Sequence, residues 1–238
     1  MEWRRREGVE WLQACLPGGA AVAFSTRNGG TSEAPYDSLN LGLLTKDDPG
    51  RVGENRGLLA AALGIDPERI AFARQVHGAE LAVPGDGGSP SEADGHVISQ
   101  PGQAALVFVA DCLPIALAGP GGVAMLHCGW RGLAAGIVTR GAAAVAATDA
   151  VIGPGIGACC YEVGDEVLGA FAGLGDGIAA GRMLDLAEVA RRLLHEAGVE
   201  RIESAGLCTS CETERFFSHR RDGGRSGRQA GLAWIEGG

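Results

Sequence analysis

Apolar residues along the chain occur in short runs separated by glycine, proline and acidic residues, a pattern typical of many short strands. The first run, Ala20 to Phe24, predicts a strand. Asp48-Pro49 has the sequence of a helix N-cap followed by proline at the first helical position, so we expect a helix from there to about Gly64. Further strands are predicted at Arg69 to Gln75, Ala104 to Val109, Leu113 to Ala118, Gly122 to His127, Ala150 to Gly153, Arg201 to Gly206 and Gln229 to Ile235.

Three later stretches predict helices: the alanine-rich segment Leu133 to Ala147, then Tyr161 to Ala172 and Asp185 to Ala197. Strands and helices are mixed without strict alternation, which favours an α+β fold over a doubly wound parallel sheet. No linker, repeat or low-complexity block divides the 238 residues. We therefore expect a single domain spanning residues 1–238.

One predicted hairpin carries candidate metal chemistry. The turn signal Gly119-Pro120-Gly121-Gly122 separates two apolar strands, and a turn about the 119/120 bond sets Cys112 directly opposite His127. Opposed Cβ atoms lie about 4.5–5.5 Å apart, which lets a thiolate and an imidazole share one zinc ion. A two-residue register shift makes the pair diagonal and still bridgeable, whereas a one-residue slip places the two side chains on opposite faces.

A catalytic zinc ion needs a third protein ligand, with the fourth position left open. The chain has five histidines, and His77 lies where a predicted strand ends and a glycine turn begins. Functional side chains are often displayed at such places. A single histidine is nevertheless more often a hydrogen-bonded structural residue than a ligand, so the pattern by itself leaves the third ligand open.

Charge and hydropathy exclude several classes of partner. The net charge is −9 and the basic residues are scattered, which argues against nucleic-acid binding. No apolar run approaches the roughly 20 residues that span a bilayer, and we see no export signal, so we expect a cytoplasmic protein without a membrane partner. Of the 20 basic residues only Lys46 is a lysine, so an anion site here would use guanidinium groups.

The seven cysteines have no regular spacing and do not predict a disulfide framework. Cys208-Thr209-Ser210-Cys211 has the spacing of a redox pair or zinc knuckle. Because no second CxxC pair or histidine pair accompanies it, we interpret these two as ordinary buried thiols. Asp111 either orients a ligand imidazole by a hydrogen bond without binding the metal itself, or is an ordinary turn residue, and the sequence favours neither.

Short motifs rich in glycine, histidine, cysteine and arginine run from near the N-terminus almost to the end of the chain. They are Phe24-Ser25-Thr26-Arg27-Asn28-Gly29-Gly30, Ser38-Leu39-Asn40-Leu41-Gly42, Glu54-Asn55-Arg56, Gln75-Val76-His77-Gly78, Ala93-Asp94-Gly95, Ala110-Asp111-Cys112, His127-Cys128-Gly129-Trp130-Arg131-Gly132, Ile152-Gly153-Pro154, Cys160-Tyr161-Glu162-Val163, Cys208-Thr209 and Phe216-Phe217-Ser218-His219-Arg220-Arg221-Asp222. In this order they resemble the multicopper polyphenol oxidase or laccase-domain family of purine nucleoside phosphorylases (YfiH-like).

The resemblance implies that His77, Cys112 and His127 bind the metal, which supplies the third ligand. It implies a four-layer α/β/β/α sandwich with mixed sheets. It also implies a zinc-dependent purine nucleoside phosphorylase that splits adenosine, inosine or methylthioadenosine into base and sugar 1-phosphate, with adenosine deaminase activity in the same pocket. The expected partners are a purine nucleoside and phosphate, and the expected assembly is a monomer or small homo-oligomer.

Phosphorolysis needs an anion clamp that presents phosphate to the anomeric carbon. Arg56 is the best candidate because guanidinium groups bind phosphate through two hydrogen bonds, and Arg27, Asn40 and Arg220 are weaker ones. The alternative for Arg56 is a place on a solvated helix face. We therefore expect Cys112, His77, His127 and Arg56 to carry the catalysis.

Other functions stay open from the sequence. One is a metal-free hydrolase or amidase acting on cell-wall precursors, with Cys112 as nucleophile and His127 as base. Another is a copper-dependent polyphenol oxidase with copper as the bound ion, although five scattered histidines cannot build a trinuclear cluster. A third is a protein with a purely structural metal. His219 stands where the resembled family more often has a tyrosine-like residue, and the loop Asp222 to Arg228 is a residue longer, so substrate preference is open.

Overall fold

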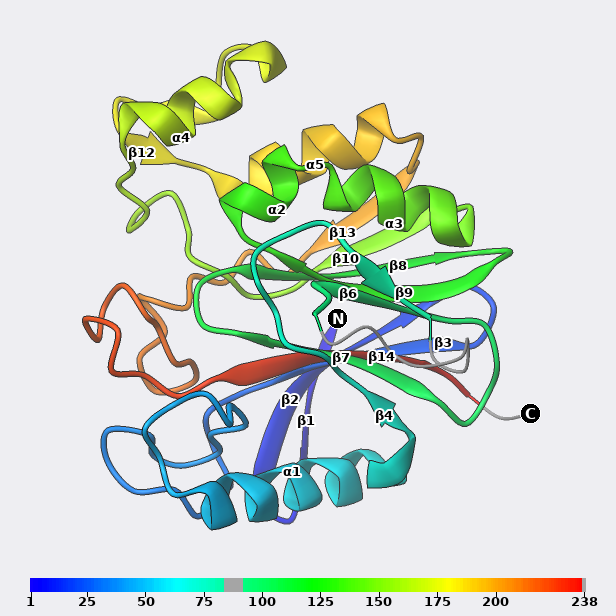
Figure 1. Ribbon diagram of the computed structural model, residues 1–238, viewed down its shortest axis with the longest axis vertical. Helices are drawn as coiled ribbons and strands as arrows, with labels where there is room; N and C mark the ends of the chain where they lie inside the picture. Colours follow the sequence, from blue (N-terminus) through cyan, green and yellow to red (C-terminus); the bar gives the residue numbers. More distant parts are fainter. Residues whose placement is uncertain (84–91, 237–238) are drawn as a thin grey trace.

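Two six-stranded sheets lie face to face in the computed structural model, with helices on both outer sides (Figure 1). The structure describes residues 1–83 and 92–236. None of the helices in this part of the chain is long and apolar enough to cross a membrane.

The first sheet has the order β1-β2-β3-β14-β7-β4, and its neighbouring strands are antiparallel except for the parallel pair β4 and β7. Its middle strands are almost wholly buried, as expected for strands covered on both sides. The strands are β1 (Glu2–Arg6), β2 (Val9–Leu16), β3 (Ala20–Ser25), β14 (Gln229–Ile235), β7 (Ala104–Val109) and β4 (Ile70–Ala71).

The second sheet has the order β13-β10-β8-β9-β6-β5 and is also mixed, because β10 and β13 are parallel, as are β5 and β6. A separate two-stranded ribbon joins β11 to β12. The strands are β13 (Arg201–Ser204), β10 (Asp149–Ile152), β8 (Leu113–Gly119), β9 (Gly122–Cys128), β6 (Gly95–Ile98), β5 (Leu81–Ala82), β11 (Ala179–Ala180) and β12 (Met183–Leu184).

Helices cover the two outer faces of this pair of sheets. Helix α1 lies against the first sheet, and α2, α3 and α5 lie against the second (Figure 1). The helices are α1 (Pro49–Leu63), α2 (Trp130–Ala134), α3 (Ile137–Val145), α4 (Asp165–Ala170) and α5 (Leu186–Glu196), with 3-10 turns η1 (Pro67–Arg69) and η2 (Ala172–Leu174).

Three apolar clusters fill the spaces between these layers. Phe24 and Met125 belong to the cluster between the sheets, Leu59 packs α1 on the first sheet, and Val189 packs α5 on the second. Burial of these apolar faces is the main force that holds the layers together. The predictions of an α+β class and of a four-layer sandwich with mixed sheets are both confirmed.

The helix ends encoded by local sequence are where the pattern predicts them. The Asp48 side chain accepts a hydrogen bond from the Arg51 amide at 3.0 Å, and α1 ends at Gly64 in the left-handed conformation. The Asp185 side chain caps α5 in the same way, accepting from the Glu188 amide at 2.9 Å.

Other predicted elements are shorter than their sequence patterns. The helix predicted from Leu133 to Ala147 is broken into α2 and α3 by Gly136, whose φ of 85° is left-handed. The helix predicted from Tyr161 to Ala172 has only the six residues of α4. The strand predicted from Arg69 to Gln75 is reduced to β4. The fully exposed strand β1 has no apolar alternation, and the pattern therefore missed it.

The β8–β9 hairpin has a register different from the predicted one. Gly119 pairs with Gly122 and Pro114 pairs with His127, so the turn is the two-residue loop Pro120-Gly121. The prediction that Cys112 lies directly opposite His127 is wrong, because the register is shifted by two residues and the pair is diagonal. Gly119 can occupy this strand position because it has no Cβ, which would lie 2.2 Å from the Ala146 carbonyl oxygen.

Candidate active site

A cavity of about 830 Å³ opens between the loops at one end of the two sheets. Its wall combines apolar and aromatic side chains with several arginines, and its lining also includes the histidine and cysteine side chains that the sequence singled out. It is lined by Gly42, Leu43, Leu44, Thr45, Arg56, Phe72, Ala73, Arg74, Gln75, His77, Phe108, Ala110, Asp111, Cys112, His127, Gly129, Trp130, Arg131, Ile156, Tyr161, Leu186, His219, Arg220 and Arg228.

His77, Cys112 and His127 meet in this cavity, with one ligand atom of each within 4.8 Å of the others. His127 lies near the end of β9, Cys112 directly precedes β8, and His77 follows β4 with a left-handed φ of 61°. The two imidazole rings are 4.8 Å apart, centroid to centroid, and nearly perpendicular. Two imidazole nitrogens and a sulfur this close together can hold one metal ion with a further position open to the cavity.

Asp94 positions two of these residues from behind. Its Oδ1 is 2.8 Å from His127 Nδ1, and its carboxylate accepts hydrogen bonds from the backbone amides of Val76, His77 and Gly78 at 2.7–3.1 Å. These bonds hold the His77 turn in its left-handed conformation and turn His127 Nε2 toward Cys112. The sequence analysis missed this role, although Ala93-Asp94-Gly95 is one of the motifs that carry the family resemblance.

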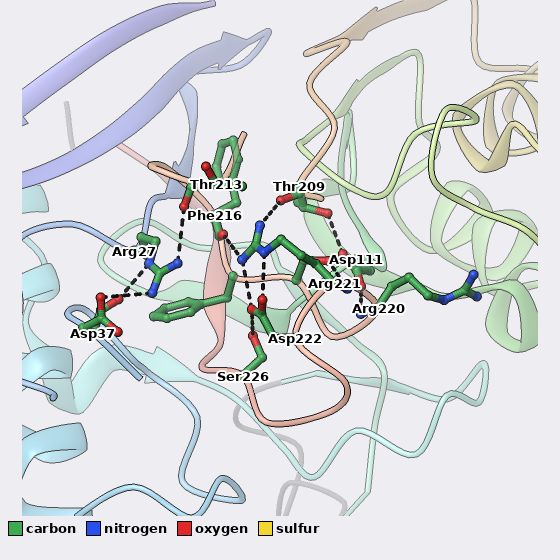
Figure 2. A network of polar contacts seen from close by, with 12 residues as sticks. Arg27, Asp37, Asp111, Thr209, Thr213, Phe216, Arg220, Arg221, Asp222 and Ser226 are labelled. Atoms are coloured by element: carbon green, nitrogen blue, oxygen red, sulfur yellow. Dashed lines mark hydrogen bonds and ion pairs between the residues drawn. The ribbon is translucent and has the colours of Figure 1, made fainter. Parts of the chain in front are cut away.

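Asp111, a candidate for that orienting role, holds a loop instead. Its carboxylate accepts hydrogen bonds from the Thr209 hydroxyl and the Arg220 backbone amide, both at 2.7 Å (Figure 2). Arg221 extends the network through the Thr209 carbonyl and the Asp222 carboxylate. Asp111, the residue before Cys112, therefore ties the loop after β13 to the start of β8.

The thiol and the imidazole in this group favour each other's charged forms. Burial opposes the Cys112 thiolate, but the adjacent His127 and hydrogen bonds from His127 and His77 lower the pKa of Cys112 to about 6. Burial likewise opposes the His127 cation, but Cys112 and Asp94 raise the pKa of His127 to about 9.

Arg56 lines the cavity and does not lie on a solvated helix face. Its guanidinium carbon is 4.7 Å from the Phe72 ring centre and 4.6 Å from that of Phe108, and its Nε donates to the Leu41 carbonyl at 2.9 Å. Burial lowers the pKa of Arg56. No carboxylate pairs with it within residues 1–83 and 92–236, so its η nitrogens are available to an anion.

The other phosphate candidates lie in different places. Arg220 is on the cavity wall, where its guanidinium lies over the Tyr161 ring and donates to the Glu162 carbonyl. Arg27 is outside the lining and is paired with Asp37 (Figure 2). Asn40 is fully buried. Its side-chain amide donates hydrogen bonds to Thr45 and Asp47 and accepts hydrogen bonds from two backbone amides. The structure therefore does not bring Arg27 and Asn40 to the cavity.

Three further arginines, Arg74, Arg131 and Arg228, line the cavity, and Arg74 is paired with Glu92. Neither Arg131 nor Arg228 has a carboxylate partner in the described part of the chain. Arg131 follows His127 by four residues, a nearness visible in the sequence. Arg228 lies 116 positions after Cys112 along the chain and reaches the cavity only through the fold.

The comparisons with known proteins agree with this fold. The family model described as "Multi-copper polyphenol oxidoreductase laccase" matches residues 21–236. A curated relative named purine nucleoside phosphorylase YfiH, from Escherichia coli (strain K12), is 39% identical over 240 residues, which cover 95% of this chain and 97% of the relative.

Solved structures are equally similar over nearly the whole chain. The crystal structure of Neisseria meningitidis protein NMB0706 has a TM-score of 0.85 and 36% identity, covering 95% of this chain and 99% of that one. The structure of Bacillus licheniformis hypothetical protein YfiH has a TM-score of 0.87 and 32% identity, covering 98% of this chain and 99% of that one.

Proposed function

The chain belongs to the family of multi-copper polyphenol oxidoreductase laccases, and from that membership we propose that it is a zinc-dependent purine nucleoside phosphorylase. It splits adenosine, inosine or methylthioadenosine with phosphate into the free base and a sugar 1-phosphate. The observation that carries the proposal is a His-Cys-His group in a cavity lined by aromatic rings and unpaired arginines. The names of the curated relatives support the same reaction.

The donor set fits zinc. Two imidazole nitrogens and one thiolate are ligands that zinc prefers, and three protein ligands are typical of its catalytic sites. When bound, the ion supplies a Lewis acid facing the cavity. The Asp94 carboxylate accepts a hydrogen bond from Nδ1–H of His127, which leaves Nε2 free to bind the metal.

The residues around the metal ligands favour zinc over copper-oxidase chemistry. A trinuclear copper cluster needs many imidazoles. The chain has five histidines. His77 and His127 are at the site, His219 lines the cavity but does not belong to the group of converging ligand atoms, His96 is buried in β6, and His195 is in α5. We therefore propose one metal ion per cavity.

The cavity wall suits a purine nucleoside. Phe72, Phe108, Trp130 and Tyr161 supply flat rings on which a base can stack. Burial, with a smaller contribution from Cys112, raises the pKa of Tyr161 to about 12, so its phenol stays neutral and its O–H is available as a hydrogen-bond donor.

The arginines suit the second substrate. Arg56, Arg131, Arg220 and Arg228 line the cavity, and none is paired with a carboxylate within the described residues, although the whole chain carries a net charge of −9. Guanidinium groups in this state bind phosphate well. In phosphorolysis a phosphate oxygen attacks the anomeric carbon, the glycosidic C–N bond breaks, and its electron pair and a proton go to the base.

We also propose adenosine deaminase activity at the same site, because a metal ion held by His77, Cys112 and His127 would supply the Lewis acid that zinc deaminases use to activate water. Product analysis of adenosine with and without phosphate separates the two reactions. Adenine and ribose 1-phosphate that form only with phosphate support the phosphorylase, and inosine in either condition supports the deaminase. Failure to convert any purine nucleoside contradicts both.

Substitution of Arg56 tests the phosphate clamp. Arg56→Ala is expected to raise the KM for phosphate about 10- to 100-fold, the loss expected for one charge-assisted hydrogen-bonding group. Arg51→Ala, on the same helix but paired with Glu33 outside the cavity, is the matched control and is expected to leave the KM unchanged. An unchanged phosphate KM in Arg56→Ala places the clamp on other residues.

One observation favours a second function. The arrangement matches an acid–base–nucleophile triad formed by Asp94, His127 and Cys112. Asp94 is hydrogen-bonded to Nδ1 of the His127 ring, and Cys112 is hydrogen-bonded to the other side of that ring. A metal-free hydrolase or amidase acting on cell-wall precursors would use this order. Rapid alkylation of Cys112 in metal-free protein that retains activity supports it, whereas loss of activity with a chelator and its return with zinc support the metalloenzyme.

A further inference from the structure

Four cysteines meet outside the cavity, where two loops run side by side. Cys159 and Cys160 lie in the loop after β10, and Cys208 and Cys211 lie in the loop after β13. Their four sulfur atoms all lie within 4.8 Å of one another. The interpretation of Cys208 and Cys211 as two ordinary buried thiols is therefore wrong, because Cys211 is exposed and both belong to a four-sulfur cluster.

The spacing of the sulfurs fits one tetrahedral metal ion. Zinc–sulfur bonds of about 2.3 Å set the sulfurs of a tetrahedron about 3.8 Å apart. Cys211 Sγ is 3.5 Å from both Cys159 Sγ and Cys160 Sγ. These distances exceed the roughly 2.05 Å of a disulfide bond, and one metal ion can bind all four sulfurs.

The backbone around Cys208 is arranged for a thiolate. The Gly157 amide donates to Cys208 Sγ at 3.2 Å, and the amides of Ser210 and Cys211 also point at this sulfur. Amides converging on one sulfur stabilise its negative form and are typical of the tight turns in cysteine-rich zinc sites.

The cluster lies between two neighbouring loops, one of which is long. Residues 205–228, all described, contain no helix or strand, and loops longer than about 12–15 residues without secondary structure are uncommon in compact domains. This loop runs beside the first one through a bridge between Gly155 and Cys208 and a 3.0 Å hydrogen bond from the Thr209 amide to the Gly155 carbonyl.

We propose that Cys159, Cys160, Cys208 and Cys211 bind one zinc ion in a closed, four-thiolate structural site. Four protein ligands leave no position for substrate or water, so the ion stabilises the loops and does not take part in the reaction. Two neighbours connect it to the cavity. The Thr209 hydroxyl donates a hydrogen bond to Asp111, the residue before Cys112 (Figure 2). Tyr161, the residue after Cys160, lines the cavity wall.

Metal counting on the full chain tests the proposal. Protein reconstituted with zinc and desalted is expected to hold two equivalents, one for each group of ligands. Cys112→Ala and Cys211→Ser are each expected to hold one equivalent, and the double variant none. Cys15→Ser, an exposed cysteine outside both groups, is the matched control and keeps two.

The Cys112→Ala variant isolates the four-cysteine site, so the result does not depend on the proposed function. In this variant cobalt(II) is expected to give strong thiolate-to-metal absorption, and the four cysteines resist alkylation until the metal is removed. Cys112→Ala protein without zinc, with these cysteines freely alkylated or joined as disulfides, overturns the proposal. This measurement also decides the question if Cys211→Ser fails to fold.

Discussion

Residues outside the group His77, Cys112 and His127 also shape the candidate metal centre. Asp94 accepts hydrogen bonds from three backbone amides around His77 and the Nδ1 proton of His127, so one carboxylate sets the positions of both histidines. Gly129 leaves the space into which the Cys112 thiol and the His77 ring converge. Outer residues of this kind tune metal affinity as well as geometry.

Gly129→Ala is expected to weaken metal binding at His77, Cys112 and His127. A Cβ at this position would lie 2.9 Å from Cys112 Sγ and 3.2 Å from His77 Cδ2, while the φ of −80° suits alanine. We expect metal affinity to fall about 10- to 100-fold, the range for changes around metal ligands, as measured by competition with a chelator. Gly53→Ala, with open space around its Cβ, is the control; equal affinities in the two variants would contradict this account.

At the scale of elements, the β8–β9 hairpin does most to place the site. It delivers Cys112 at the start of one strand and His127 near the end of the other. Its far end packs against the end of α3, where a Cβ on Gly119 would lie 2.2 Å from the Ala146 carbonyl oxygen. In the observed register Gly119 pairs with Gly122 and Pro114 pairs with His127, which sets the Cys112–His127 pair diagonal.

Gly119→Ala is expected to destabilise this contact. Backbone atoms cannot move aside cheaply, and overpacking of this kind typically costs about 1–3 kcal/mol of unfolding free energy. Chemical denaturation measures the change. Gly169→Ala in α4, with no neighbouring atom within 4 Å of its Cβ, serves as the control; a Gly119→Ala protein as stable as this control would show that the hairpin end yields without strain.

At the scale of the whole molecule, the two sheets are joined through an apolar layer between them. Phe24 of β3 and Met125 of β9 belong to this layer. Gly153, which follows β10, packs so closely on the Phe24 ring that a Cβ added to it would lie 2.5 Å from the ring atoms. The cavity is built from loops of both sheets. Its shape therefore depends on this layer, although none of these three residues lines it.

Phe24→Ala is expected to reduce the unfolding free energy by about 3–5 kcal/mol, because it removes a fully buried aromatic ring and leaves a void between the sheets. Leu44→Ala, which is 85% exposed, is expected to change it by less than about 0.5 kcal/mol. Denaturant unfolding followed by tryptophan fluorescence measures both. Similar stabilities for the two variants would mean that the sheets are not held together by this layer.

The sequence by itself determined the features that depend on neighbours a few residues away. The caps of α1 and α5 are hydrogen bonds between Asp48 or Asp185 and an amide three residues on, so the local residues predict them. The glycine–proline turn likewise predicts a hairpin that carries Cys112 and His127 on adjacent strands.

Only the tertiary structure decided features that depend on packing between distant segments. The end of the β8–β9 hairpin approaches α3 so closely that only glycine fits at position 119, and the position of His77 depends on the hydrogen bond that its backbone amide donates to Asp94, directly before β6. The four cysteines belong to two loops about fifty residues apart, and Arg56 faces the cavity because Phe72 and Phe108 lie beside it. Contacts of this kind depend on burial of apolar surface across the whole fold, which no short segment encodes.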